Sequence, residues 1–192
     1  MYSRQLNNAK SQHLWQHLIV YFMLFSVFGH WLEIGYCEFL RIVGGDYDPN
    51  AKLWRDPFDP YFVYGVGGCL CILALLPLKE KLGKHIKNTG VLVITSYLIN
   101  ASAMTFIELI EGLLINQDHK WWDYSGMPFN FAGQICLQNF LAFGLASSCV
   151  VWVVFPVLER QLRMMKRSVF NTFAVILGVY FVYFVYLYEL PR

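Results

Sequence analysis

Five long apolar stretches, separated by short polar segments, constrain this chain more than any other feature of its sequence. A helix needs roughly 20 residues to cross the hydrocarbon core of a bilayer. We therefore expect five transmembrane helices, at Leu14–Leu40, Tyr61–Leu78, Gly90–Ile115, Phe131–Leu158 and Val169–Leu190. Apolar residues occupy both alternation faces of these stretches, which excludes a transmembrane β-barrel. The sequence predicts an all-α, polytopic membrane bundle in which residues 1–192 form a single membrane domain.

The composition supports a membrane protein and excludes several other classes. Hydrophobic residues make up 57% of the chain and charged residues only 15%, whereas a soluble domain has roughly 25% charged residues. This excludes a disordered chain, a disulfide-stapled miniprotein and a nucleic-acid-binding module with a basic face. An odd number of cysteines within or beside apolar stretches favours structural thiols over disulfides or metal ligands; they are Cys37, Cys69, Cys71, Cys136 and Cys149. We expect no cofactor and no nucleic-acid partner.

The distribution of lysine and arginine predicts the orientation of the chain. In a five-span protein, the amino-terminal segment and the second and fourth connections lie on one face, and here they carry ten of these residues. The opposite face carries five. Because cytoplasmic loops are enriched in Lys and Arg, we expect a multi-pass protein of the cell membrane with its amino terminus in the cytoplasm and its carboxyl terminus outside.

Acidic and amide side chains interrupt the apolar stretches at one depth. Glu33 and Glu38 lie in the last third of the first stretch, and Glu108 and Glu111 lie near the outer end of the third. A charge at the bilayer centre costs about 3 kcal/mol, so such residues usually face a protein interior or a water-filled cavity. The fourth stretch contributes amides at a similar depth: Asn130, Gln134, Gln138 and Asn139.

Two interpretations of this polar layer stay open. In the first, the layer is an outward-facing pocket that receives a cation, a polar solute or a lipid headgroup. In the second, the side chains hydrogen-bond to one another and to the backbone, and so hold the helices together.

The segment Trp121–Asn130 combines interfacial aromatic residues with turn-forming residues. Trp121, Trp122 and Tyr124 suit the headgroup region, where an aromatic ring and a polar edge are both accommodated. Asp123 can accept a hydrogen bond from the backbone two residues further on and so form a turn. Asn130 is expected to cap the fourth helix. The segment is therefore either an interfacial anchor or the lip of a binding site.

The string WWDYS-x-x-PFN-x-x-G-x-IC, from Trp121 to Cys136, resembles the signature of the type IV ABC-transporter (CmpB-like) membrane protein family. Gly29, Glu33 and Tyr64-Gly65-Val66-Gly67 resemble further landmarks of this family, as does Glu108 or Glu111. The resemblance extends from about Ser26 to Pro156 and departs from the family pattern in the loop before Tyr64. It implies a membrane subunit of a transport system.

No G-x-x-x-x-G-K-[ST] phosphate-binding loop is present, so the chain is not itself the ATPase. Our leading hypothesis is a permease or solute-binding membrane component that is energised by a separate ATPase and acts as an oligomer or within a complex. The candidate substrate-binding residues are Glu33, Glu108, Glu111, Trp121, Trp122, Asp123, Tyr124, Asn130 and Gln134. The alternative is a non-catalytic accessory or scaffold subunit of a larger membrane complex. A third possibility is a lipid-modifying enzyme, but no activated nucleophile is visible, and we expect the protein not to be an enzyme.

Overall fold

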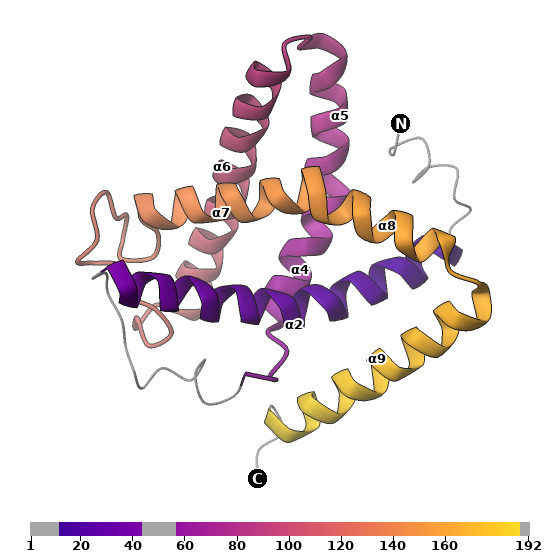
Figure 1. The fold of residues 1–192 in the computed structure, drawn as a ribbon. Helices are drawn as coiled ribbons and strands as arrows, with labels where there is room; N and C mark the ends of the chain where they lie inside the picture. Colours follow the sequence, from indigo (N-terminus) through magenta and orange to yellow (C-terminus); the bar gives the residue numbers. More distant parts are fainter. Residues whose placement is uncertain (1–11, 44–56, 189–192) are drawn as a thin grey trace. The chain divides into compact units, whose positions relative to one another are not determined.

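The computed structural model describes residues 12–43 and 57–188, and these residues contain five helical segments of membrane-spanning length (Figure 1). The segments are Trp15–Val43, Phe62–His85, Thr89–Ile115, Leu137–Met164 and Arg167–Tyr188. No strand is present in this part of the chain, where the only β-type pairing is an isolated bridge between Phe131 and Ile135. The predicted all-α architecture is therefore confirmed.

Seven α-helices and two π-helical segments make up these spans. The α-helices are α2 (Gln12–Val43), α4 (Phe62–Leu70), α5 (Leu76–His85), α6 (Thr89–Ile115), α7 (Leu137–Cys149), α8 (Phe155–Met164) and α9 (Arg167–Tyr188). The π-helical segment η1 (Cys71–Leu75) lies between α4 and α5, and η2 (Val150–Val154) lies between α7 and α8.

Three of the expected helix ends are wrong by six residues or more, and one of them is the end of the fourth span, which continues to Met164 rather than ending at Leu158. The second span continues through its lysine-rich end to His85 rather than ending at Leu78, because lysine and glutamate are good helix formers and can be solvated beyond the lipid. The fourth span begins at Leu137 rather than Phe131. The apolar residues before Leu137 belong instead to a compact loop, in which Phe129, Ala132 and Gly133 have positive φ angles that no α-helix can contain.

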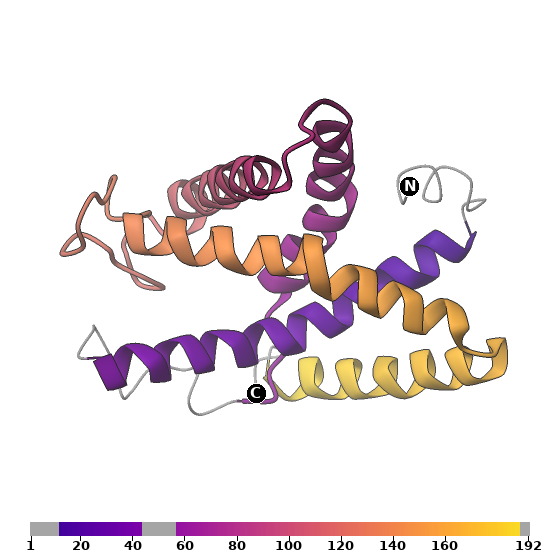
Figure 2. The same ribbon diagram turned by 45° about the horizontal axis from the view of Figure 1, so that its top comes forward.

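The described residues group into two compact units, of which the first is Leu70–Glu159. Within it, α6 and α7 pack along each other, as Figure 2 shows. A Cβ atom placed on Gly144 of α7 would lie 2.8 Å from both Ala101 Cβ and Tyr97 Cε2 of α6. The Tyr97 hydroxyl donates to the carbonyl of Leu141 at 3.0 Å. A small residue thus allows close helix packing, as is common in membrane bundles.

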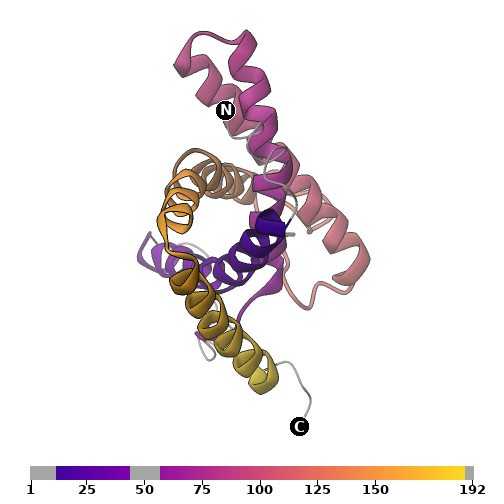
Figure 3. The same ribbon diagram turned by 90° about the vertical axis from the view of Figure 1, so that its right-hand side faces the viewer.

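The second unit contains α2, α4 up to Cys69, and α9. Figure 3 shows α9 beside α2, and the two helices are in contact. The rings of Phe22, Phe62 and Phe181 pack together with centroid separations of 5.5–5.9 Å. Gly65 and Gly68 of α4 lie directly against α2 side chains, so that a Cβ at either position would overlap them. Aromatic rings and glycines therefore set the packing within this unit.

Candidate functional site

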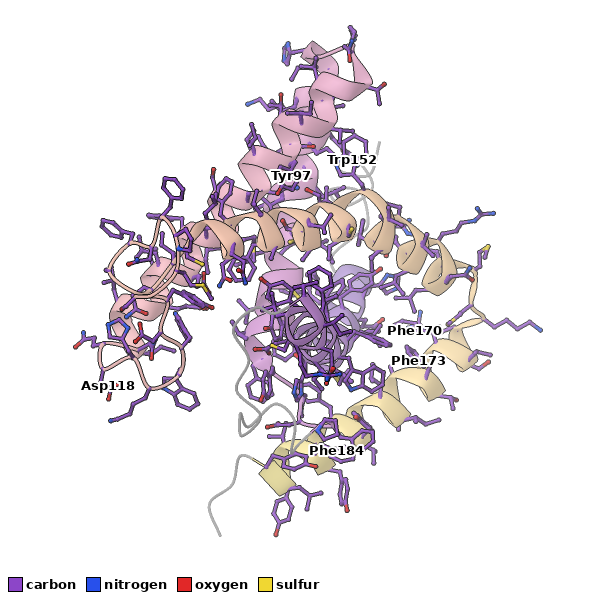
Figure 4. The ribbon with its side chains drawn as sticks, turned by 60° about the vertical axis from the view of Figure 1, so that its left-hand side comes forward. Tyr97, Asp118, Trp152, Phe170, Phe173 and Phe184 are labelled. Atoms are coloured by element: carbon purple, nitrogen blue, oxygen red, sulfur yellow. The ribbon has the colours of Figure 1, made fainter. Side chains whose placement is uncertain are left out.

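The loop between α6 and α7, residues 116–136, folds back on itself at the ends of these two helices (Figure 4). The Tyr124 amide donates to the carbonyl of Gly133 at 2.8 Å, and the Phe131 amide donates to the carbonyl of Ile135 at 2.9 Å. The loop therefore has its own hydrogen-bonded backbone. It contains the whole family-like string, whose last residue, Cys136, is also the N-cap of α7.

Two buried amide side chains close this loop. Gln134 Nε2 donates to the Asn116 carbonyl at 2.8 Å, and Asn116 Nδ2 donates to Gln134 Oε1 at 3.0 Å. Asn116 also receives a hydrogen bond from the Trp121 amide at 2.9 Å and donates to the Trp122 carbonyl at 2.7 Å. These contacts join both ends of the loop. The sequence indicated Gln134, but placed it on a helix, and Asn116 was missed.

Gly112 provides the space for this network. A Cβ atom on Gly112 would lie 2.8 Å from Gln134 Cδ and 2.9 Å from Gln134 Cβ. The last turns of α6 can therefore approach the Gln134 side chain only because residue 112 lacks a side chain.

The two neighbouring tryptophans have different environments. Trp122 is partly buried, and its indole nitrogen donates to the Gln134 carbonyl at 3.0 Å. Trp121 is 73% exposed. Trp122 therefore belongs to the interior of the loop, while Trp121 is free to contact lipid, a partner or a solute.

Asp123 forms the turn that the sequence predicts, since its Oδ1 accepts a hydrogen bond from the Ser125 amide at 2.9 Å. The hydrogen bonds from Ser125 hold the pKa of the Asp123 carboxyl below its usual range. The predicted role of Asn130 is wrong. Its Nδ2 donates to the carbonyls of Ser125 and Met127 at 3.1 and 3.0 Å, and it does not cap α7 because six loop residues separate it from that helix.

Glu108 is a buried acidic side chain of the first unit, with only 9% of its surface exposed. Its Oε1 accepts a hydrogen bond from Asn139 Nδ2 at 3.1 Å and a longer one from the Tyr124 hydroxyl at 3.4 Å. Burial raises the pKa of Tyr124, and the nearby Glu108 carboxylate raises it further, so the phenol stays a neutral donor. Glu108 Oε2 is buried and has no hydrogen-bond partner in the described part of the chain.

Two further polar residues, Thr105 and Glu111, lie close to Glu108 on α6. Glu111 lies three residues further along and is partly exposed. Thr105 lies three residues before Glu108 and is 7% exposed, and its hydroxyl is also buried without a hydrogen-bond partner among the described residues. Thr105 was missed because a threonine within an apolar stretch carries no signal of its own.

Glu33 belongs to the second unit, where it hydrogen-bonds to Tyr64. One turn before it, the buried His30 ring stacks on Tyr61 at a centroid separation of 3.8 Å. His30 Nδ1 donates to the Asp59 carbonyl at 2.7 Å. Glu33 thus has a separate aromatic and polar environment, and a common pocket with Glu108 stays a prediction.

Glu38 is partly exposed and forms an ion pair with a residue of the same helix. Its Oε2 lies 2.7 Å from Arg41 Nε, and both side chains are about half exposed. Such a pair contributes little to stability. Glu38 therefore offers a matched control for substitutions of the buried glutamates.

Comparison with known proteins identifies the family. No curated protein and no solved structure matches the chain significantly. The family described as "Putative ABC-transporter type IV" matches residues 20–187, which is nearly the whole chain and more than the resemblance in the sequence covered. The match and the five apolar helices together indicate an ABC-transporter-related, multi-pass membrane protein. The chain belongs to this type IV ABC-transporter family.

Proposed function

We propose that this chain is the permease or solute-binding membrane component of a transport system, and that polar groups near the junction of α6 and α7 form its outward-facing site. Family membership supports the transport context. The proposal concerns binding and passage of a solute, and it assigns no catalytic reaction to the chain.

The observation that carries the proposal is the environment of Glu108. The carboxylate is buried at membrane depth, and the partners of its Oε1 are neutral groups, the Asn139 amide and the Tyr124 phenol. No ion pair of the described residues includes Glu108. Ionisable residues in membrane spans are costly and mark ion and substrate pathways. A purely structural role would be served by a neutral glutamine at lower cost.

The loop 116–136 has the properties expected of a segment that forms the entrance of such a site. Its Asn116–Gln134 contacts fix its shape, and Tyr124 reaches from it to Glu108. On its outer side, Trp121 is 73% exposed and Phe129 is 84% exposed. A loop that is fixed inside and aromatic outside can position a solute and also rest in the headgroup layer.

The chain lacks a phosphate-binding loop, so we propose that a separate ATPase supplies the energy. The connections Lys79–Asn88 and Glu159–Ser168 would be its docking surfaces on the cytoplasmic side. Because they are short, we also propose that the chain works as an oligomer or with another membrane subunit.

Thermal unfolding of the purified chain in lipid nanodiscs tests the proposal. We would measure Tm with a panel of polar probes: amino acids, choline, glycine betaine, putrescine and glucose. A probe that binds the folded state raises Tm. We expect this rise to disappear in Glu108→Gln or Glu111→Gln and to persist in the partly exposed control Glu38→Gln. A rise that is unchanged in both test variants would contradict the proposed site.

The surface of α9 favours the second candidate function, an accessory or scaffold subunit. Its apolar side chains are largely exposed, and several of them lie at helical spacing along one face: Val175, Val179, Val182 and Tyr186. Such a face can pack against a helix of another subunit. Copurification with a stoichiometric partner in mild detergent would support this function, whereas a monodisperse lone monomer would count against it.

A further inference from the structure

We infer that Thr105 and Glu108 form a binding site for one inorganic monovalent cation in the interface between α6 and α7. The inference rests on the proposed function and names the ligand class of the same site. It starts from two oxygen atoms, Thr105 Oγ1 and Glu108 Oε2, which are both buried and both without a hydrogen-bond partner among the described residues.

The packing of α6 on α7 places these two oxygens in one interface. Residues three apart share a helix face. On one side of Thr105 along α6, Ala101 lies against Gly144 of α7, and on the other side Glu108 hydrogen-bonds to Asn139 of α7. Thr105 lies between these two contacts, on the face that α7 covers. Both oxygens therefore lie within about one helical turn of each other between the same two helices.

Buried polar atoms in native proteins almost always have a partner. One orphan oxygen can reflect a local compromise, but two within one turn indicate a shared ligand. Carboxylate and hydroxyl oxygens are hard ligands, which bind hard cations rather than soft transition metals. The donor set therefore points to a hard cation, of the alkali or alkaline-earth class.

The single negative charge of the site favours a monovalent cation over a divalent one. Glu108 supplies one negative charge, and the groups that contact its Oε1, Asn139 and Tyr124, are neutral. A monovalent cation makes this interior neutral, whereas a divalent cation would leave an excess charge at membrane depth, which is costly. Glu111 is partly exposed and can be balanced by solvent.

The space at the site favours an ion over an organic ammonium group. One turn from Thr105, Ala101 is fully buried and in close contact with Gly144. The two backbones are therefore near each other at this level, and an alkylammonium would have to separate them. A dehydrated ion of the size of Na⁺ needs no such separation.

Occupation of this site would also affect the loop. Tyr124 joins the loop to the same carboxylate that would hold the ion. A bound cation would fix the Glu108 side chain and so stabilise the position of Tyr124. Cation binding and solute binding would thus favour each other through one side chain, which is the energetic basis of coupling between two ligands.

The test is thermal unfolding of the full chain in nanodiscs at pH 8.5, in NaCl, KCl or N-methyl-D-glucamine chloride of equal ionic strength. We expect Tm of the unsubstituted chain to be higher in NaCl or KCl by about 2–4 °C. Glu108→Gln should abolish the difference, and Thr105→Val should reduce it. The matched controls are Glu38→Gln and Thr172→Val, which replaces an exposed threonine of α9, and both should retain the difference. Binding of ²²Na⁺ to the same samples measures the site directly, and it stays informative if one variant folds poorly.

Each outcome decides the inference. A Na⁺- or K⁺-dependent shift that Glu108→Gln abolishes and Thr105→Val reduces supports it. Equal Tm values in all three salts would overturn it, as would a shift that either substitution leaves unchanged. Failure of this inference would not contradict the proposed function. A probe from the solute panel could still raise Tm through Glu108 or Glu111 in a chain whose Tm does not depend on Na⁺ or K⁺.

Discussion

Asn116 and Gln134 are joined by two hydrogen bonds that run in opposite directions, at 2.8 and 3.0 Å, across the whole length of the loop between α6 and α7. Both side chains are almost completely buried. The pair therefore holds the loop in a single conformation. Any binding site that includes Tyr124 or Trp121 depends on it.

Gln134→Ala should destabilise the protein. The substitution leaves the Asn116 carbonyl and one Asn116 Nδ2 hydrogen bond without their partner, and a buried polar group left unpaired costs about 1–3 kcal/mol. In a chain of this size, each kcal/mol lowers Tm by roughly 2–4 °C. Thermal unfolding in nanodiscs measures the change.

The control for this substitution is Gln117→Ala. Gln117 is exposed and donates to the Leu113 carbonyl at 2.9 Å, so its loss should change Tm little. In addition, Asn116→Ala combined with Gln134→Ala should cost less than the sum of the single substitutions, because the two residues share their hydrogen bonds. Strict additivity would show that the pair does not act as a unit.

Gly144→Ala should loosen the packing of α6 on α7. The added methyl group would lie 2.8 Å from Ala101 Cβ and from the Tyr97 ring, and overpacking of this kind costs about 1–3 kcal/mol. Gly178→Ala of α9 is the matched control, since its new methyl group would have no neighbour within 4 Å. We expect a lower Tm for the first variant and no loss for the second. Equal Tm values would show that this contact is dispensable.

The Asp123 turn should weaken in acid. Its carboxyl pKa is lowered in the folded state by hydrogen bonds from Ser125, so its contribution is fully present above the unfolded value of 3.8. The contribution is lost as the pH falls through that value and the lower folded pKa. Amide exchange of Ser125, corrected for the intrinsic rate at each pH, should show falling protection below about pH 4.

Two variants separate this effect from general acid unfolding. Asp123→Asn keeps an acceptor oxygen but cannot titrate, so protection of Ser125 should become insensitive to pH in the same range. Asp118→Asn removes a different exposed carboxyl, which pairs with Lys120, and should leave the Ser125 profile unchanged. An unchanged profile in Asp123→Asn would assign the acid effect to another group.

The number of helices and their approximate positions could be predicted because they depend on the length and hydropathy of each stretch alone. The start of the fourth helix could not. Apolar residues predominate from Phe129 through Leu137, and hydropathy does not distinguish a helix from a largely apolar loop. The positive φ angle of Gly133 excludes an α-helix at this position. Within this stretch, the glycine is the one residue whose type suggests such a backbone conformation.

The candidate site was predictable to the extent that a charge in an apolar stretch is conspicuous. Glu108 was predicted for this reason, whereas Tyr124 was predicted as an interfacial aromatic residue and Asp123 as a turn former, and Asp123 does form the predicted turn. Asn116 and Thr105 gain their roles only from tertiary packing, which places an amide opposite Gln134 and a hydroxyl beside Glu108. Neither residue differs in type from the many Asn and Thr residues that cap helices or face solvent.

Cysteine labelling tests the predicted orientation, which governs whether the Glu108 region faces outward. Gly126 has open space around it in the loop between α6 and α7, and Lys87 is exposed between α5 and α6. Because the lysine-rich connection should be cytoplasmic, a membrane-impermeant maleimide should label Gly126→Cys in intact cells. Lys87→Cys should react only after permeabilisation. The unsubstituted chain controls for its five native thiols. The reversed pattern would place Glu108 on the cytoplasmic side, and a solute site there would serve export or an intracellular partner instead of uptake from outside.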